Sequence, residues 1–239
     1  MKNKWKDFWQ KYRIVNVAHD GDLLYQCGLT VGGKPIGNEL FASIISDISA
    51  GLELDRNDCV LDLCCGNGMI TFELAKKVQS IIGIDFSREY ISNANKYKKD
   101  ENIEYILHDI TKLNEIKDVL ELKSINKVLL YGSLAYFTSK DFEVILDNLS
   151  RYSKHITTIF IGGILDRKKI WKFYDTPARK FDLLIKTVLR NDPGVGKWWA
   201  KSCIKKLSAK KGYSCCYLGQ NPLLHTAHYR FDVVLTKEK

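Results

Sequence analysis

One stretch of nine residues, 60–68, constrains the fold of this chain more than any other. The apolar run at residues 59–63 is typical of a buried parallel strand, and residues 69–77 have the pattern of a helix. A turn containing Gly66 and Gly68 joins them. Glycine is needed where the backbone takes a positive φ or passes close to a ligand. Strand, tight turn and helix in this order build a cradle for a ligand.

A second apolar run, residues 81–84, ends in Asp85. An acid at the tip of the second strand, about 20 residues past the turn, can accept hydrogen bonds from a ribose diol. The dinucleotide fingerprint G-x-G-x-x-G would fall on Cys64, Gly66 and Met69, of which only one is glycine. Met69 would obstruct a pyrophosphate at the helix start. A ligand with a ribose and no phosphate therefore fits better than NAD.

The same stretch resembles motif I, D-x-G-x-G-x-G, of the class I S-adenosylmethionine-dependent methyltransferases. Asp62, Gly66 and Gly68 match the motif, and Cys64 stands where its first glycine normally is. The resemblance continues through residues 83–87 and on to the C-terminus. It implies a Rossmann-like α/β fold with a seven-stranded, mostly parallel sheet, an antiparallel last strand and a helical insertion before the last two strands. It also implies S-adenosylmethionine as the cofactor.

The resemblance further implies which residues bind the cofactor. Asp85 would hold the ribose, Asp109 would accept from the adenine amine and Ile110 would lie on the ring. Capping of the next turn is the alternative role for Asp109. The segment 24–30 resembles one that folds over the cofactor's methionine end in small bacterial methyltransferases; ordinary loop contacts are the alternative. The implied cofactor-binding residues are Asp62, Cys64, Gly66, Gly68, Asp85, Phe86, Asp109, Ile110, Tyr25, Gln26 and Thr30.

Length and composition predict a single domain. The chain has 239 residues, of which 45% are hydrophobic and 27% charged, as in ordinary globular proteins. No apolar run approaches the roughly 20 residues that cross a bilayer, and no secretory signal is visible, so we expect a cytoplasmic protein. Seven cysteines without a C-x-x-C pair indicate reduced thiols and no metal site.

Four segments are expected within this domain. Residues 1–52 hold N-terminal helices and a lid loop, including a helix with Trp5, Phe8, Trp9 and Tyr12 at helical spacing. This helix either packs on the domain or covers the cofactor. Residues 20–36 are rich in glycine and predict a loop, and residues 38–52 predict an amphipathic helix. Residues 53–163 form the cofactor-binding core, 164–212 a basic helical cap, and 213–239 a closing strand pair.

The cap carries most of the positive charge. Residues 166–212 contain fourteen Lys or Arg and four Asp, whereas the whole chain has a net charge of +9. A positive region beside a crevice would attract an anionic acceptor, or RNA, although a solvated helical surface is the alternative. Arginine suits a bidentate phosphate contact better than lysine. Arg167 and Arg179 are therefore the candidate ligands for the acceptor.

Catalytic candidates follow from the strand ends. Residues 132–137 lack the [D/N/S]-P-P-[Y/F/W] sequence of DNA and protein-glutamine methyltransferases, which argues against planar amide or base-amine acceptors. Tyr131 precedes this segment. A hydroxyl acceptor needs a base, and histidine is the usual one near neutral pH. We expect His228 in this role, with His225 as the second candidate and with Tyr229 and Arg230 beside the acceptor. Surface-turn chemistry is the alternative.

The sequence thus predicts an S-adenosylmethionine-dependent methyltransferase. By resemblance to small bacterial enzymes of surface-polysaccharide pathways, it would O-methylate a small sugar-like, possibly phosphorylated or nucleotide-linked acceptor. An RNA methyltransferase is the enzymatic alternative. A catalytically inactive, cofactor-binding partner subunit is the non-enzymatic one.

Overall fold

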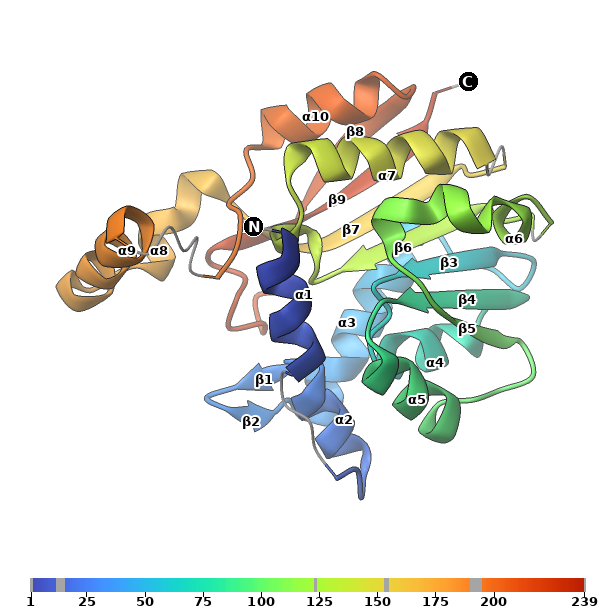
Figure 1. Ribbon diagram of the computed structural model, residues 1–239, viewed down its shortest axis with the longest axis horizontal. Coiled ribbons are helices and arrows are strands. Elements are labelled where there is room, and N and C mark those ends of the chain that lie inside the picture. Colours follow the sequence, from blue (N-terminus) through green and yellow to red (C-terminus); the bar gives the residue numbers. More distant parts are fainter. Residues whose placement is uncertain (1, 12–15, 123, 153–154, 190–194, 239) are drawn as a thin grey trace.

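The computed structural model describes residues 2–11, 16–122, 124–152, 155–189 and 195–238. Its centre is a seven-stranded sheet in the order β5-β4-β3-β6-β7-β9-β8 (Figure 1). Strands β3 to β7 are parallel, and β9 runs antiparallel to both of its neighbours. The expected fold class is confirmed. The strands are β3 (Cys59–Leu63), β4 (Ser80–Asp85), β5 (Ile103–Leu107), β6 (Lys127–Tyr131), β7 (Thr158–Leu165), β8 (Tyr213–Gly219) and β9 (Arg230–Lys237).

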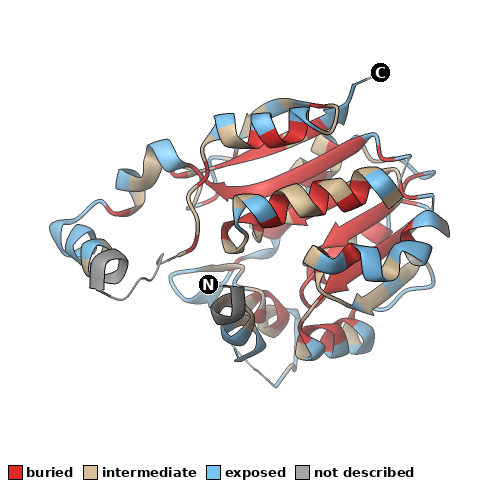
Figure 2. Cartoon of the chain, turned by 45° about the horizontal axis from the view of Figure 1, so that its top comes forward, coloured by how far each residue is buried: buried red, intermediate tan, exposed pale blue. Residues whose placement is uncertain are grey.

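Helices cover both faces of the sheet, because successive side chains of each buried strand point to opposite sides. Val60 packs against the layer of α3, α4 and α5, whereas Leu61 packs against the layer of α6, α7 and α10. Figure 2 shows the buried sheet between the two layers. The covering helices are α3 (Asn38–Leu52), α4 (Met69–Ala75), α5 (Arg88–Tyr97), α6 (Lys117–Leu122), α7 (Ser139–Tyr152) and α10 (Lys201–Ala209); the 3₁₀ segments η1 (Ile110–Ile116) and η2 (Leu134–Tyr136) lie in connections.

The N-terminal region is more ordered than its glycines predict. Residues 20–36 form α2 (Asp20–Gln26) and a small hairpin of β1 (Thr30–Val31) and β2 (Lys34–Pro35), so the expected loop is wrong. Leu23 and Leu24 are buried in the core, which gives the helix an apolar face. The Asp22 carboxylate accepts from the backbone N–H of Ala18 and stabilises the helix start. The helix α1 (Lys2–Lys11) includes the first three of the expected aromatic positions; Tyr12 lies outside the described residues.

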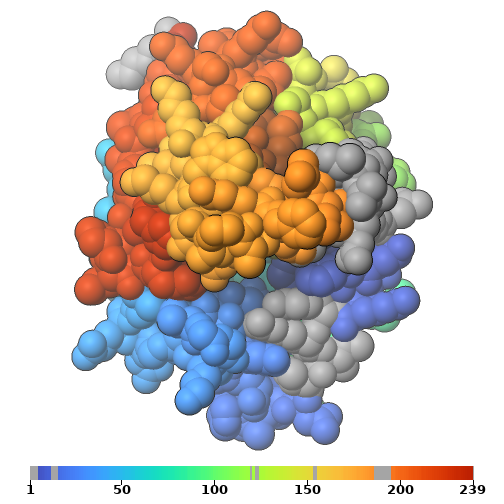
Figure 3. Space-filling view, turned by 90° about the vertical axis from the view of Figure 1, so that its left-hand side faces the viewer, coloured from blue at the N-terminus to red at the C-terminus, as the bar shows by residue number. Residues whose placement is uncertain are grey.

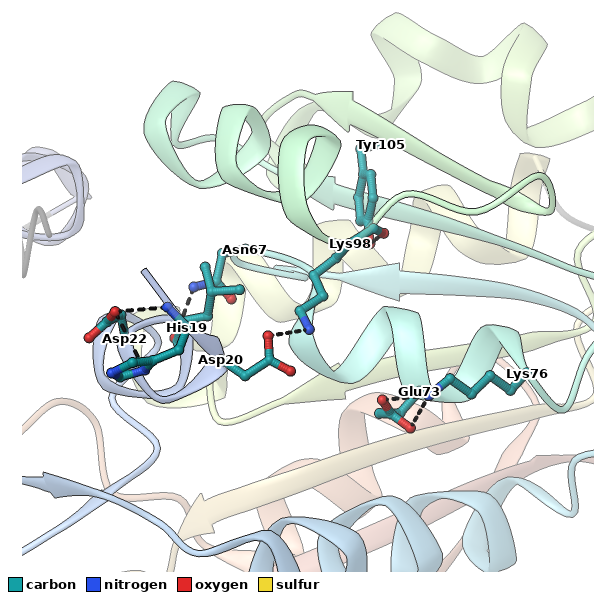
Figure 4. A network of polar contacts seen from close by, with 9 residues as sticks. His19, Asp20, Asp22, Asn67, Glu73, Lys76, Lys98 and Tyr105 are labelled. Carbon is teal, nitrogen blue, oxygen red and sulfur yellow. Dashed lines mark hydrogen bonds and ion pairs between the residues drawn. The ribbon is translucent and has the colours of Figure 1, made fainter. Parts of the chain in front are cut away.

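Polar contacts join α2 to the core (Figure 4). The buried Lys98, directly after α5, forms an ion pair with Asp20 at 2.7 Å. Asn67, between β3 and α4, is fully buried and donates to the backbone oxygen of Leu23 at 2.9 Å. A buried amide that satisfies backbone groups of another element fixes the relative position of the two. Helix α2 therefore belongs to the rigid part of the domain.

The expected basic cap divides into two parts. The 3₁₀ segment η3 (Arg167–Lys169), α8 (Ile170–Phe173) and α9 (Pro177–Leu189) stand away from the sheet (Figure 1). Helix α10, in contrast, buries Ile204 and Leu207 in the core and covers the sheet. Residues 190–194 of the expected cap lie outside the described residues. We call η3, α8 and α9 the basic arm.

The packing of α3 on β7 gives a stability prediction. A Cβ added at Gly51 would overlap the ring of Phe160, which is 1% exposed. Overpacking a buried ring costs about 1–3 kcal/mol, while the helix propensity gained by alanine is at most about 1 kcal/mol. We therefore expect Gly51→Ala to lower the free energy of unfolding, measured with urea. Gly219→Ala, whose Cβ would meet no atom within 4 Å, is the matched control. A Gly51→Ala protein as stable as the wild type would contradict this packing.

Candidate active site

The carboxyl ends of the parallel strands meet at one edge of the sheet and surround a cavity of about 410 Å³. Asp85 and Tyr131 end β4 and β6 and line this cavity. Arg230 lines it as well, because β9 runs antiparallel and begins at the same edge. Ligands of open α/β sheets bind at this edge. One cavity thus collects residues from both halves of the sheet.

The turn after β3 forms one wall. Its backbone takes left-handed φ values at Cys64 (59°), Gly66 (59°) and Gly68 (80°). This conformation is unfavourable for a residue with a Cβ, which explains why the first motif position is normally glycine. Cys64 nevertheless adopts it, and its side chain is half-buried beside the cavity. Gly66 also lines the cavity, where the missing side chain leaves the backbone accessible.

Asp85 holds this turn against β4. Its Oδ2 accepts from the backbone N–H of Gly66 at 3.1 Å, and its Oδ1 accepts from that of Ser87 at 2.8 Å. The side chain is buried, with 5% of the residue exposed, and still lines the cavity. Burial raises the pKa of Asp85 to about 6, against the effect of the backbone donors. The group is therefore ionised at neutral pH and can accept from a ligand.

Two of the expected motif residues lie behind the turn rather than in the cavity. Asp62 is buried and accepts from the Thr71 hydroxyl at 2.6 Å, and burial raises its pKa to about 7. A Cβ at Gly68 would overlap the Tyr105 hydroxyl group. Neither Asp62 nor Gly68 is among the lining residues. Their positions indicate that they shape the turn, and their expected direct contact with the cofactor stays a prediction.

The segment before motif I is also placed differently. Thr30 lines the cavity, as do Cys27, Gly28 and Leu29, but Tyr25 and Gln26 do not. Gln26 is fully buried, and its Oε1 accepts from Asn67 at 2.8 Å. It is therefore used to join α2 to the motif turn. Tyr25 and Gln26 both belong to helix α2 and do not line the cavity. This position does not favour the cofactor contacts that we expected of them.

The opposite wall is formed by residues that come after the ends of β4 and β5. Phe86, Asp109 and Ile110 line the cavity, as expected. Asp109 caps η1 by accepting from the Thr111 N–H at 3.0 Å, and it forms an ion pair with Lys6 of α1. Burial alone would raise the pKa of Asp109, but the Lys6 and Thr111 donors outweigh it and hold the pKa below its ordinary value. Asp109 thus has the capping role and also faces the cavity.

Helix α1 closes the cavity from outside. Trp5 and Trp9 line it and pack on Tyr136, with ring centroids 4.8 and 5.3 Å apart. Trp9 also contacts the ring of Tyr90 on α5 at 6.4 Å. Aromatic contacts of this kind contribute about 0.5–1.5 kcal/mol beyond their buried area. The aromatic stripe therefore packs on the domain, as expected, and it lines the cavity; that it covers the cofactor stays a prediction.

The far end of the cavity carries the acceptor candidates. Tyr131, His225, Tyr229 and Arg230 all line it. His225 has a pKa below its ordinary value, chiefly because of burial and then because of the positive charges of Arg230 and His228. Burial raises the pKa of the Tyr131 hydroxyl, so this phenol stays protonated. The neutral imidazole can accept a proton.

His228 itself is exposed and lies outside the cavity, with its ring packed edge-on against Tyr229 at 4.7 Å. Its place outside the cavity does not favour its expected role as the base. His225, three residues earlier in the same turn region, is exposed as well, but it lines the cavity. Arg167 and Arg179 are likewise exposed and do not line the cavity, and Arg179 pairs with Asp175 at 3.0 Å on the basic arm. Both arginines are therefore surface residues, and this position does not favour the acceptor contacts that we expected of them.

Sequence reasoning missed Lys6, Ser133 and Gln220, all of which line the cavity. Gln220 directly follows β8, whose carboxyl end lies at the same edge as those of the parallel strands. The strand-end rule that identified Asp85 could therefore have identified Gln220.

Comparison with known proteins agrees with this geometry. Residues 60–155 match a family described as "Methyltransferase domain". The 23S rRNA (uracil(1939)-C(5))-methyltransferase RlmD of Haemophilus influenzae is 38% identical over 82 residues, 33% of this chain and 18% of that protein. A demethylmenaquinone methyltransferase of Lactobacillus johnsonii is 38% identical over 56 residues, 22% of this chain and 23% of that protein. The chain spans less than a quarter of the length of these curated relatives.

Solved structures agree in fold over nearly the whole chain. Magnesium protoporphyrin IX methyltransferase (ChlM) from Synechocystis PCC 6803, with bound SAH, has a TM-score of 0.60 at 13% identity and covers 99% of this chain and 95% of its own. A SAM-dependent methyltransferase from Anabaena variabilis has a TM-score of 0.61 at 18% identity, with coverage of 94% and 96%. Residues 60–155 thus match a methyltransferase family, and the chain has the fold of these S-adenosylmethionine-dependent methyltransferase structures.

Proposed function

We propose that this protein transfers a methyl group from S-adenosylmethionine to a hydroxyl of a small anionic acceptor. One observation carries the proposal: the motif turn with Asp85 and the cluster of His225 and Arg230 line a single cavity. Two ligands bound at its two ends would meet inside it. The aromatic cover of α1 keeps water out of such a chamber.

The residues at the first end fit the cofactor. Asp85 offers buried carboxylate oxygens, and Gly66 leaves room for a ligand close to the backbone. We assign the ribose hydroxyls to Asp85 and the adenine to Phe86, Asp109 and Ile110. When bound, S-adenosylmethionine supplies a methyl group on a positively charged sulfur, and the sulfur becomes a neutral thioether. The protein's part is to align the two ligands and exclude water.

At the second end, His225 would remove the acceptor proton. Its lowered pKa keeps the imidazole neutral at pH 7, as a base must be. The new bond joins the acceptor oxygen to the methyl carbon, the carbon–sulfur bond breaks with its electron pair going to sulfur, and the proton goes to His225. Tyr131, which stays protonated, can donate a hydrogen bond to the acceptor.

RNA methylation is the second candidate function. Relatives that match part of the chain are rRNA methyltransferases, and the basic arm exposes Trp171 and Phe181 beside its lysines and arginines. Figure 3 shows the arm on the face that also carries α1 and the β1–β2 hairpin. Exposed aromatic rings with cations suit single-stranded RNA. The match to the Haemophilus influenzae protein covers only 33% of the chain, however, and the arm does not line the cavity.

The two functions are separated by following the methyl group. We expect methyl-labelled S-adenosylmethionine to transfer its label to the small-molecule fraction of a cell extract and not to the RNA fraction. Label in RNA, together with salt-dependent RNA binding that is lost when Lys168, Lys169 and Lys172 are all changed to Gln, would establish the second function instead. Cofactor binding without transfer to either fraction would indicate an inactive partner subunit.

Cofactor binding is tested at Asp85. Asp85→Ala removes hydrogen bonds to a charged acceptor, each worth about 1.5–3 kcal/mol, so affinity for S-adenosylhomocysteine should fall more than tenfold. Because the pKa of Asp85 is raised to about 6, wild-type affinity should also fall as the pH drops below 6 and the carboxyl becomes protonated. Calorimetric titration measures both effects. The exposed Glu101→Ala is the control; equal affinity in a folded Asp85→Ala protein would remove Asp85 from the site.

The base is tested at His225. We expect His225→Ala to lower turnover of the labelled acceptor by roughly 10²–10⁴ while affinity for S-adenosylhomocysteine is unchanged. Since the pKa of His225 lies below 6.5, wild-type turnover should fall with acid only below that pH. His228→Ala, which changes an exposed ring outside the cavity, should keep its activity. Loss of activity in His228→Ala but not in His225→Ala would instead identify His228 as the base.

A further inference from the structure

Arg230 presents a half-buried cation to the acceptor end of the cavity. Its guanidinium Nε is buried and has no hydrogen-bond partner in the described part of the chain. None of the ion pairs formed by the described residues includes Arg230. The guanidinium lies 5.7 Å from the centroid of the Tyr229 ring, but a cation–π contact supplies no counterion, and a partly desolvated charge without one is unfavourable. Such a group is expected where a ligand supplies the missing anion.

The fold makes room for this side chain. The pairing of β7 with β9 shifts register between Ile161 and Ile164, and Gly163 lies within this irregularity in a left-handed conformation (φ 71°). A Cβ at Gly163 would lie 3.3 Å from the Nη1 of Arg230. Bulges of this kind redirect a side chain next to an active site. The missing side chain at Gly163 therefore leaves space for the guanidinium.

The carboxyl group of Asp232 feels the positive charge of Arg230, but its hydrogen bonds are made to other groups. Asp232, two residues further along β9, accepts from the Gly163 N–H at 2.7 Å and from the Gln220 amide at 3.1 Å. The Gln220 Oε1 accepts from the Thr226 hydroxyl at 3.0 Å. This chain of hydrogen bonds fixes the β8–β9 connection, and both Gln220 and Thr226 line the cavity beside Arg230. Asp232 is thus a positioning residue.

The charges in the cavity select the kind of anion. Lys6 and Arg230 are the lysine and arginine residues among the described residues that line it, and Lys6 is paired with Asp109. One positive charge is then left for the acceptor. A single guanidinium matches the charge and the planar fork of a carboxylate. A phosphate dianion would bring a second negative charge into a cavity that also contains Asp85 and Asp141.

We propose that the acceptor carries a carboxylate that Arg230 binds, and that this carboxylate orients the acceptor hydroxyl toward His225. The inference rests on the proposed function and specifies its acceptor. The basic arm has no part in it, because its arginines lie outside the cavity.

Three aromatic probes of similar size test the inference: benzoate, phenyl phosphate and benzamide. Their rings suit the aromatic walls, and their head groups are a monoanion, a dianion at pH 8 and a neutral amide. Binding is measured by ligand-observed NMR at pH 8 on protein saturated with S-adenosylhomocysteine. We expect benzoate to bind the wild type at least tenfold more tightly than benzamide and more tightly than phenyl phosphate.

The variants locate the effect. Arg230→Gln should remove the preference for benzoate over benzamide, and Arg230→Lys should keep only part of it because the fork is lost. Arg179→Gln on the basic arm should bind all three probes like the wild type. Equal binding of benzoate and benzamide, or a preference that survives in Arg230→Gln, would overturn the proposal. Tighter binding of phenyl phosphate would overturn the carboxylate assignment.

Titration of S-adenosylhomocysteine into the same proteins separates this inference from the proposed function. Wild-type protein that does not bind S-adenosylhomocysteine contradicts the proposed function itself. Wild-type protein that binds it but shows no preference for benzoate contradicts only the role of Arg230. Bound S-adenosylhomocysteine in Arg230→Gln also shows that this variant is folded.

Discussion

The hydrogen bonds between the Asp85 carboxylate and the backbone of Gly66 and Ser87 are the constraint on which the site depends. They hold the motif turn, whose backbone is left-handed at Cys64 and Gly66, against the end of the neighbouring strand. A turn in this conformation does not persist without such contacts, because a cysteine in it costs conformational energy. The same carboxylate faces the cavity. The Asp85 carboxylate thus holds the turn and, in our proposal, also binds the ligand. Burial is the main reason that its pKa is raised.

On its other side the turn is held through Asn67. Its amide donates to Leu23 and Gln26, and its oxygen accepts from the Cys27 thiol at 2.8 Å. This network connects α2 to the turn and so places Cys27, Gly28 and Leu29 at the cavity wall. An N-terminal segment far from the motif in sequence is thereby as fixed as the motif itself. The cavity is built from elements that a buried amide holds together.

Much of the fold was predictable because the signal is local. The strand at 59–63 and the helix at 38–52 follow from apolar periodicity, and Asp85 follows from its place at a strand end. Residues 20–36 were mispredicted because glycine content outweighed the buried pair Leu23 and Leu24, whose partners are distant in sequence. The choice between His225 and His228 depended on the direction of side chains in a turn, which no periodicity encodes. Arg230 was predicted near the acceptor, but its lack of a partner could be read only from the structure.

The number of charged residues in a region likewise does not tell where their charges lie in the structure. Residues 166–212 hold fourteen cations, yet the arginines at 167 and 179 are exposed, and water and salt screen exposed charges over about 8 Å at physiological ionic strength. Arg230 is a single cation, but its Nε is buried, where an electrostatic interaction is stronger and an unmatched charge is more costly. The net charge of a region can steer a ligand from a distance. In our proposal the sign and number of charges on the bound acceptor are instead set by the few groups inside the cavity, where the Arg230 guanidinium takes part in none of the ion pairs of the described residues.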